Sequence, residues 1–470
     1  MASLTPGISK IEYPLDSLDT RSCVSVCRSL GAEITELRRA NSSCPNPMDE
    51  NGEKLVQWIV HGRGPVSIPD SPKQDLRVRP PCAAKPVSPL SPGCSDVTSW
   101  DVTFCNAGNS GTTLFLGLAA ASLGTHPVQF DGDEQLRSRS AALLLEALEG
   151  LGVQVSSDSG CAPIIVRGPW KGGRVSLLCP TSQYLSALLL AAPLAPKGVT
   201  TEIDITLLNE GPYIEMTLSY LEALKIPYKT NKDFSYFYIS GGAQYKPLDG
   251  PIPADFSSAA FPAAAAAISG GSLTLLGLDP EDTQGDKEFF NMIKKMGCEV
   301  NWDQVPLEHI LLGPFVPDTL KAIGQKPLEL EIAEWRLTVS RKGSLKGNVF
   351  DLNAAPDLLP VMAIMASYAH GDTALVNVAH ARIKETDRIS AMAQELKKLG
   401  VQTRELPDGL IIHGQGSLNG GKVSGRGDHR IVMALAAGAM AAKGTLEISD
   451  AQAAAVSYPG FLELLGANVV

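Results

Sequence analysis

Two short segments of the chain carry cations where a helix is expected to begin. One is Lys384-Glu385-Thr386-Asp387-Arg388 and the other is Asp428-His429-Arg430. Apolar residues at helical spacing follow in 389–399 and 431–435. The N-terminus of a helix carries partial positive charge, so Arg or Lys there is unfavourable by a few tenths of a kcal/mol, up to about 1. An anionic ligand between the helix end and the cations would remove this conflict, which points to a phosphate or carboxylate substrate.

At least five other helices are expected to begin with small or polar residues, in 106–113, 132–140, 180–183, 255–258 and 356–357. In the first of these segments Asn109 is the expected N-cap. In the second, Arg137 and Arg139 are suited to binding phosphate through paired hydrogen bonds, and a solvated charged loop is the alternative. Each segment taken alone also fits ordinary helix-start chemistry. If the helix N-termini of both halves point into one cleft, their dipoles would add to form an anion site between two domains.

The elements that must position these residues recur along the chain. A helical run, a Leu-Gly or Met-Gly pair and a short strand are expected at five places, around Gly31, Gly152, Gly297, Gly400 and Gly466. Glycine is the common residue just past a helix end. A second recurring pattern is an Ala-rich helix followed by Gly and a β-branched strand. The Gly and strand of each copy lie at 198–203, 271–275, 371–375 and 444–448. A unit of helix–strand–helix–strand repeated about six times predicts a repetitive α/β fold rather than an irregular one.

Composition limits the classes of function. The chain has 470 residues, 44% of them hydrophobic, which allows two to three domains with large cores. A net charge of −10 argues against non-specific nucleic-acid binding. The longest apolar runs, 184–194 and 259–268, are too short to span a bilayer, and the N-terminus lacks the features of a signal peptide. Nine scattered cysteines without a C-x-x-C pair fit reduced thiols in a cytoplasmic protein, with no metal site.

The most specific motifs resemble those of one enzyme family. Arg382-Ile383-Lys384-Glu385-Thr386-Asp387-Arg388, with 428–430 and 457–461 downstream, is similar to the 5-enolpyruvylshikimate-3-phosphate synthase (3-phosphoshikimate 1-carboxyvinyltransferase) family. Segments 109–113, 132–139 and 182–185 add to the resemblance, which runs from about residue 15 to 470 and is interrupted by a proline-rich insertion at about 65–95. The sibling family that acts on UDP-N-acetylglucosamine shares the fold but not the Lys-Glu-Thr-Asp-Arg run.

The resemblance implies a two-domain inside-out α/β barrel of about six repeats, the enolpyruvyl transferase fold. The lobes are expected to comprise 15–247 and 1–14 plus 248–470, with the active site in the cleft between them. The family moves the enolpyruvyl group of phosphoenolpyruvate onto the 5-hydroxyl of shikimate 3-phosphate, a step of the shikimate pathway to chorismate and the aromatic amino acids. It releases phosphate and needs no cofactor. A cytoplasmic monomer that binds neither nucleic acid nor membrane is expected.

The same resemblance implies a role for individual residues. Asp357 is the base for the hydroxyl, and Glu385 and Lys384 handle the proton at the enolpyruvyl group. The residues implied to hold phosphoenolpyruvate are Arg139, Gln183, Arg388, His429 and Arg430. Those implied to face shikimate 3-phosphate are Thr181, Ser182, Gln183, Tyr213, Asp357 and Lys384.

The chain also departs from the family pattern. A helix near the N-terminus that carries a Lys-Ser pair is missing, because Pro6-Gly7-Ile8-Ser9-Lys10 leads almost at once into the segment beginning at Leu15. Phe115 replaces an Arg, Glu210 replaces a Ser that binds the shikimate phosphate, and Val456 replaces a C-terminal Lys. A carboxylate beside a phosphate dianion is repulsive unless it turns away. A diverged enzyme of the same fold with another cyclic alcohol as acceptor, and a non-catalytic relative, are therefore the alternatives.

Overall fold

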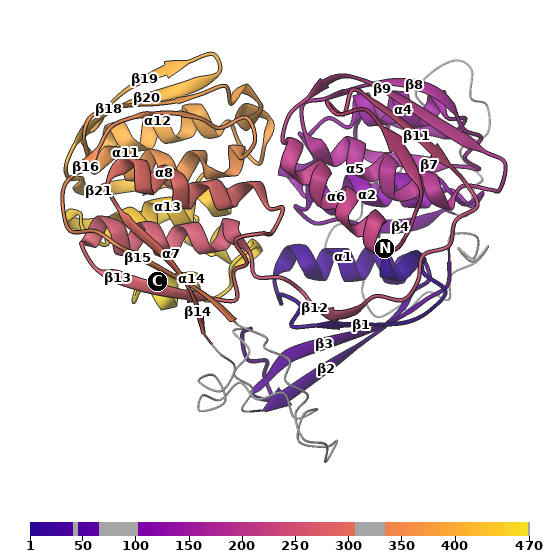
Figure 1. Ribbon diagram of the computed structural model, residues 1–470, viewed down its shortest axis with the longest axis horizontal. Helices are drawn as coiled ribbons and strands as arrows, with labels where there is room; N and C mark the ends of the chain where they lie inside the picture. Colours follow the sequence, from indigo (N-terminus) through magenta and orange to yellow (C-terminus); the bar gives the residue numbers. More distant parts are fainter. Residues whose placement is uncertain (41–45, 65–101, 306–333, 469–470) are drawn as a thin grey trace.

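The computed structural model describes residues 1–40, 46–64, 102–305 and 334–468, and the predicted proline-rich insertion lies outside these ranges. The described residues form two lobes that lie side by side (Figure 1). Each lobe has its own hydrophobic core, one drawn from residues 26–245 and the other from residues 256–462. Helices fill the interior of each lobe and small sheets cover the outside (Figure 1). The predicted α/β architecture of repeated units is confirmed.

The first lobe is built on three four-stranded sheets of one design, in which two parallel strands are followed by an antiparallel pair. The sheets are β12 (Asp249–Pro251), β1 (Gly7–Glu12), β3 (Glu53–Gly62) and β2 (Glu33–Ala40); β4 (Thr103–Asn106), β5 (Val128–Asp131), β7 (Cys161–Arg167) and β6 (Gln154–Asp158); and β8 (Gly173–Cys179), β9 (Thr200–Leu208), β11 (Tyr236–Ser240) and β10 (Tyr228–Thr230). The helices are η1 (Ala2–Leu4), α1 (Leu18–Ser29), α2 (Gly111–Ala121), α3 (Glu134–Arg137), α4 (Ala142–Gly150), α5 (Ser182–Ala191), η3 (Ala192–Leu194) and α6 (Gly211–Ala223).

One helix that the design calls for is absent from the first repeat. In the second and third sheets a buried helix, α2 or α5, connects the two parallel strands. In the first sheet the parallel partner of β1 is β12, which lies much later in the chain, at residues 249–251. Residues 1–17 contain only η1 and β1. The missing N-terminal helix inferred from the sequence is therefore also missing from the fold.

The second lobe repeats the design less completely within the described residues. Its sheets are β13 (Ser272–Leu276), β15 (Glu334–Ser340) and β14 (Glu299–Val305); β16 (Leu345–Lys346) and β17 (Val349–Asp351) beside β18 (Ala369–Val376), β20 (Gly409–Gln415) and β19 (Gln402–Leu406); and β21 (Asn419–Ser424) with β22 (Lys443–Ser449). Its helices are α7 (Phe256–Ser269), η4 (Gly285–Lys287), α8 (Glu288–Met296), η5 (Pro356–Leu358), α11 (Leu359–Ser367), η6 (Ala379–Ile383), α12 (Arg388–Lys398), α13 (His429–Ala439), η7 (Ala451–Val456) and α14 (Phe461–Leu464). Every residue of α11 is buried, as expected for a helix at the centre of a lobe.

The repeated Leu-Gly and Met-Gly pairs mark helix ends, as the sequence predicts. The glycine of each pair has a positive φ, between 69° and 110°, in Gly31, Gly152, Gly297, Gly400 and Gly466. Glycine adopts this left-handed conformation without the penalty that a Cβ imposes. A strand follows the first four, whereas the described residues after Gly466 form none.

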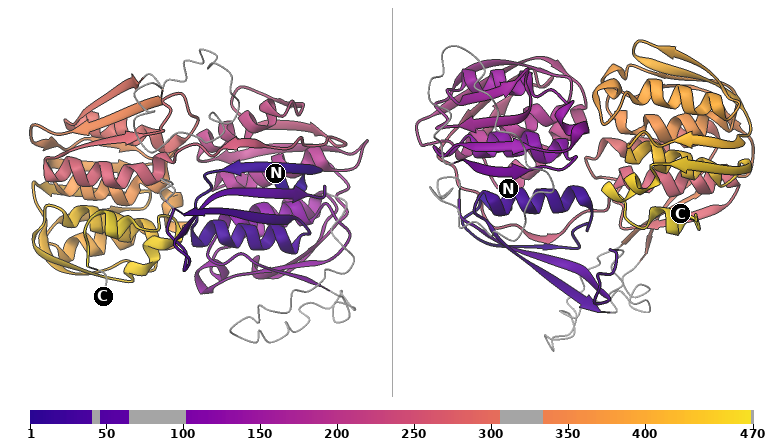
Figure 2. Two further views of the ribbon diagram at one scale, coloured as in Figure 1. Left: turned by 90° about the horizontal axis from the view of Figure 1, so that it is seen from below. Right: turned by 180° about the vertical axis from the view of Figure 1, so that it is seen from behind.

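The chain passes from the first lobe to the second between β12 and α7, and its N-terminus lies in the first lobe (Figure 2). Strand β1 pairs along its whole length with β3 on one side, and its residues 10–12 pair with β12 on the other. Residues 7–12 thus lie in a sheet with strands of the first lobe, although the sequence assigned 1–14 to the second. The lobe limits of 15–247 and 1–14 plus 248–470 remain a prediction. Within the described ranges, no helix has the length and apolar character needed to cross a membrane.

Candidate active site

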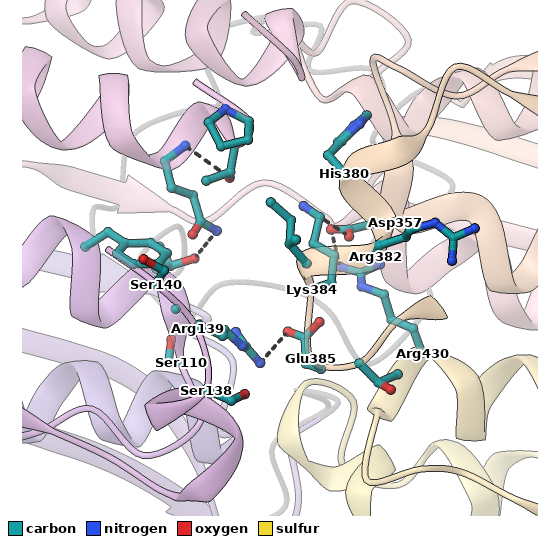
Figure 3. Close-up of a pocket in the computed structure, with 18 of the residues that line it drawn as sticks. Ser110, Ser138, Arg139, Ser140, Asp357, His380, Arg382, Lys384, Glu385 and Arg430 are labelled. Carbon is teal, nitrogen blue, oxygen red and sulfur yellow. Dashed lines mark hydrogen bonds and ion pairs between the residues drawn. The ribbon is translucent and has the colours of Figure 1, made fainter. Parts of the chain in front are cut away.

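A cavity of about 590 Å³ lies between the two lobes and is lined from both of them (Figure 3). The first lobe contributes the starts of α2 and α5 and the segment after α3, and the second contributes η5, the segment before α12 and the start of α13. Ionisable side chains make up much of the cavity lining. Its charged and histidine residues are Asp19, Arg139, Asp357, His380, Arg382, Lys384, Glu385, Asp387, His429 and Arg430.

The two helices predicted from the cation-bearing segments begin where expected. Helix α12 starts at Arg388 and α13 starts at His429. The side chain of Asp387 accepts a hydrogen bond from the backbone N–H of Ser390 at 2.9 Å, and Asp428 accepts one from the N–H of Arg430 at 2.9 Å. Aspartate N-caps therefore satisfy both helix ends, and the neighbouring cations are stabilised by carboxylates of the protein.

Arg388 is the centre of a buried ion network. Its side chain is 1% exposed, and its Nε lies 2.7 Å from Oδ2 of Asp428, which is fully buried. Nη1 lies 2.7 Å from Oδ1 of Asp357, and Nη2 lies 2.5 Å from Oε2 of Glu385. Burial opposes the charge of Arg388, but Asp428 and the other carboxylates outweigh it and raise its pKa above the usual range. Arg388 thus fixes two carboxylates at the cavity wall, whereas the sequence had placed it against the ligand.

Asp357 lies where three cations of the second lobe meet. Its Oδ2 is 3.2 Å from Nη2 of Arg430 and its Oδ1 is 3.7 Å from Nζ of Lys384, in addition to the contact with Arg388. Burial would raise the pKa of Asp357, but Arg430, Lys384 and Arg388 together hold it well below its ordinary value. Asp357 is therefore an anion and is able to accept a proton or a hydrogen bond.

A contact across the cavity connects Glu385 to the first lobe. Nη2 of Arg139 lies 3.2 Å from Oε1 of Glu385, and the two side chains face each other in Figure 3. Despite burial, Arg388 and Arg139 hold the pKa of Glu385 far below its usual value. Nη2 of Arg139 also donates to Oδ1 of Asn109 at 2.9 Å, while its buried Nε has no partner among the described residues. One donor of Arg139 is thus available for a ligand.

Glu210 points into the cavity wall rather than away from it. Its Oε2 accepts hydrogen bonds from the backbone N–H of Ser182 at 2.9 Å, from Oγ of Ser182 at 2.8 Å and from Oγ1 of Thr181 at 3.0 Å. Its Oε1 accepts from Nζ of Lys384 in the second lobe. Burial raises the pKa of Glu210, but Lys384 outweighs this effect and the pKa lies below the usual value. A carboxylate therefore occupies the donors at the start of α5.

Comparison with known proteins places this site in a family. The model of the family "EPSP synthase (3-phosphoshikimate 1-carboxyvinyltransferase)" matches residues 89–465. The 3-phosphoshikimate 1-carboxyvinyltransferase of Acetivibrio thermocellus is 39% identical over 99% of this chain and 90% of its own length. That of Methanothrix thermoacetophila is 41% identical over 98% of this chain and 90% of its own. The chain belongs to the EPSP synthase family.

The fold agrees with this membership. A solved structure of EPSP synthase from Acinetobacter baumannii superposes with a TM-score of 0.67 at 23% identity, covering 99% of this chain and 91% of the other. A second structure of the enzyme from the same organism gives a TM-score of 0.67 at 22% identity. The enolpyruvyl transferase fold inferred from the sequence is confirmed.

Most of the site residues expected from the family pattern meet in one place. Eight of the eleven line the cavity: Arg139, Thr181, Gln183, Asp357, Lys384, Glu385, His429 and Arg430. The other three lie behind its wall. Ser182 donates a hydrogen bond to the buried Glu210, and Arg388 contacts the lining residue Asp357. Tyr213 lies near Asp357 and Arg430, whose charges act on its pKa. Burial is the main cause of the raised pKa of Tyr213.

The family pattern did not identify every residue at the cavity. Asp19, at the start of α1, has its pKa raised to about 6 by burial and by the charge of Glu385, partly offset by Arg139. His380 is buried and its Nε2 lies 3.2 Å from the carbonyl oxygen of Asn353. His380 and Arg382 lie within a few residues of Lys384 in the sequence, so proximity to that motif was a usable signal for both. Asp19 has no such motif beside it in the sequence, so the sequence did not identify it as a cavity residue.

Two details of the predicted helix starts need correction. Ser110, not Asn109, is the N-cap of α2, because its Oγ accepts from the N–H of Thr113 at 3.3 Å. Asn109 instead donates to Asp133 and orients Arg139. Arg137 pairs with Asp131 at 2.7 Å, at the surface of the first lobe. Only Arg139 of the two arginines lines the cavity.

Proposed function

We infer that this chain is a 3-phosphoshikimate 1-carboxyvinyltransferase, which transfers the enolpyruvyl group of phosphoenolpyruvate to the 5-hydroxyl of shikimate 3-phosphate and releases phosphate. Family membership over nearly the whole chain supports the activity. We assign the activity to this cavity because Arg139 from one lobe and Asp357, Lys384, Glu385 and Arg430 from the other all line it. Two anionic substrates need such a concentration of cations.

We assign phosphoenolpyruvate to the side of the cavity where Arg139, Arg430, His429 and Gln183 lie. The unpartnered Nε of Arg139 is suited to a phosphate or carboxylate oxygen. Burial keeps the pKa of His429 below its ordinary value despite the charge of Glu385, so His429 is a neutral donor at pH 7. Arg388 supports this end of the site indirectly, by holding Asp357 and Glu385 in place.

The protonation states suit an addition followed by an elimination. In the addition, the acceptor hydroxyl oxygen bonds to C2 of phosphoenolpyruvate, Asp357 takes the hydroxyl proton, and a proton is added to C3 to give a tetrahedral intermediate. In the elimination, the bond from C2 to the phosphate oxygen breaks, C3 loses a proton, and the double bond returns. Despite burial, Asp357 and Glu210 raise the pKa of Lys384, so it is protonated and suited to donate to C3. Glu385 is anionic and suited to remove the proton in the elimination.

We further propose that the chain works as a monomer in the cytoplasm. Both lobes of a single chain supply the cavity, so the site needs no second copy. The described cysteines Cys23, Cys27, Cys105, Cys161, Cys179 and Cys298 are free thiols, which fits a reducing compartment.

Release of inorganic phosphate by the purified protein tests the proposed activity. Release that requires both phosphoenolpyruvate and shikimate 3-phosphate is the expected result. If there is no release while phosphoenolpyruvate still raises the melting temperature, the chain uses another acceptor. Absence of both effects would indicate a non-catalytic relative.

A further inference from the structure

Glu210 lies in the wall of the cavity, beside the lining residues Thr181 and Lys384, among donors that could form an anion-binding site. The backbone N–H of Ser182 at the start of α5, two hydroxyl groups and the ammonium group of Lys384 all direct donors at its carboxylate. A helix N-terminus with hydroxyl and lysine donors is a common phosphate-binding arrangement. The carboxylate is only 3% exposed, so a ligand cannot use these donors while Glu210 holds them.

The same carboxylate connects the lobes. Glu210 belongs to the first lobe and Lys384 to the second, 174 residues further along the chain. The backbone N–H of Glu210 also donates to the carbonyl oxygen of Asn353 in the second lobe at 3.3 Å, and the amide of Asn353 donates to Asn209 at 3.0 Å. Glu210 thus links the two lobes through its side chain and its backbone.

The backbone at Glu210 is held in an unfavourable conformation. Its φ of 60° and ψ of 40° lie in the left-handed region, at the N-cap position of α6, and its side chain makes no cap hydrogen bond. Such a conformation costs a residue other than Gly or Asn free energy, and it persists where surrounding contacts enforce it. At Glu210 those contacts are the ones to Thr181, Ser182 and Lys384, which shows that the inward position is built into the site.

We propose that Glu210 is an internal competitor for the phosphate of the acceptor. Its carboxylate fills the anion site formed by Thr181, Ser182 and Lys384 and links the two lobes. The acceptor phosphate binds only after Glu210 has left these donors. Glu210 thereby sets how strongly the enzyme prefers a phosphorylated acceptor over an unphosphorylated one. This inference rests on the proposed transferase activity for the identity of the acceptor.

The test compares the binding of shikimate 3-phosphate with that of shikimate by calorimetry in the wild type and two variants. Glu210→Asn removes the charge, shortens the side chain and suits the left-handed backbone, because Asn adopts that conformation more readily than most residues. Glu210→Gln removes the charge at constant length. Glu215→Gln is the matched control, since Glu215 is an exposed residue on the same helix. Melting temperatures establish that each variant is folded.

We expect the preference for the phosphorylated acceptor to rise at least tenfold in Glu210→Asn, about 1.4 kcal/mol, and by less in Glu210→Gln. Glu215→Gln should leave the preference unchanged. An unchanged preference in Glu210→Asn would overturn the proposal. A lower preference would overturn it too, since Glu210 would then be needed to hold Lys384 for the acceptor.

These binding measurements do not require turnover, so the two inferences fail separately. If the wild type releases no phosphate but Glu210→Asn gains affinity for shikimate 3-phosphate, the competitor role stands and the transferase activity does not. If the wild type turns over and the preference is unaffected, the activity stands and the competitor role does not.

Discussion

Replacement of Arg388 by Ala should destabilise the protein severely. The family pattern places Arg388 against phosphoenolpyruvate, but its side chain is 1% exposed and contacts three carboxylates. Removing one partner of a buried ion pair costs about 3–5 kcal/mol, because the other charge is left without compensation. Asp428 is fully buried and dominates this cost, whereas Asp357 and Glu385 border the cavity and regain water.

The magnitude can be measured as a melting temperature. For a unit of 150–250 residues, 1 kcal/mol corresponds to about 2–4 °C, so Arg388→Ala should melt roughly 6–20 °C below the wild type. Calorimetry at pH 8 is the assay. Arg404→Ala is the control, because Arg404 is an exposed residue of the edge strand β19 in the same lobe. Its effect should stay within about 0.5 kcal/mol.

The pH dependence adds a second criterion. Asp357 and Glu385 have pKa values held below the ordinary range, by Arg430 and Lys384 for the first and by Arg388 and Arg139 for the second. The stability they contribute is present above their unfolded pKa, about 4, and is lost as the pH falls through their folded pKa. Without Arg388 both folded pKa values rise toward the unfolded value, so the variant has less of this stability to lose in acid. The gap in stability between wild type and Arg388→Ala should therefore stay constant from pH 8 to pH 5 and narrow as the pH falls below about 4. A variant as stable as Arg404→Ala, or a gap that does not narrow below about pH 4, would refute this reasoning.

Three further perturbations separate affinity, chemistry and stability. Arg430→Ala should lower phosphoenolpyruvate affinity at least tenfold with a smaller loss of stability than Arg388→Ala, because Arg430 is 16% exposed at the cavity; unchanged affinity by calorimetry would remove Arg430 from the ligand site. Glu385→Gln should lower kcat by about 10²–10⁴ with substrate affinity nearly unchanged, since it removes proton transfer and keeps the shape; equal losses in both would indicate a structural role. Asp286→Asn should stabilise the protein at pH 7.5 by up to about 3 kcal/mol and have little effect at pH 4.5. Burial, together with the charge of Asp357, raises the pKa of Asp286 to about 6, so the ionised form is unfavourable above that pH and Asn avoids it. A stabilisation that shrinks as the pH rises would contradict this.

Local features of the site were predictable because local chemistry determines them. The starts of α12 and α13, the N-cap of α7 at Asp255 and the helix-ending glycines follow from capping rules applied to adjacent residues. Because the helix–strand–helix–strand pattern recurs along the chain, the repetitive α/β architecture was also predictable.

Features that depend on distant segments were not predictable in this way. Arg388 takes its partners from residues 357, 385 and 428, and only the folded lobe shows that the four groups share one buried site. From the sequence, Glu210 was expected to repel a phosphate unless its side chain turned away. Its inward position depends on Lys384 in the other lobe. Likewise, only the path of α1 along β4 and α2 brings Asp19 to the cavity.

The most direct test of the account is to identify the product formed by the wild type and by Glu385→Gln in single-turnover experiments. Proton NMR of the reaction with phosphoenolpyruvate and shikimate 3-phosphate in deuterium oxide reports both the new enol ether and any deuterium that enters its methylene group. The account predicts that the wild type forms the carboxyvinyl ether with deuterium in that group, and that Glu385→Gln binds both substrates but forms little of it. An ether that forms equally fast in both proteins would contradict the assignment of proton transfer to Glu385. No ether in the wild type would contradict the proposed activity itself.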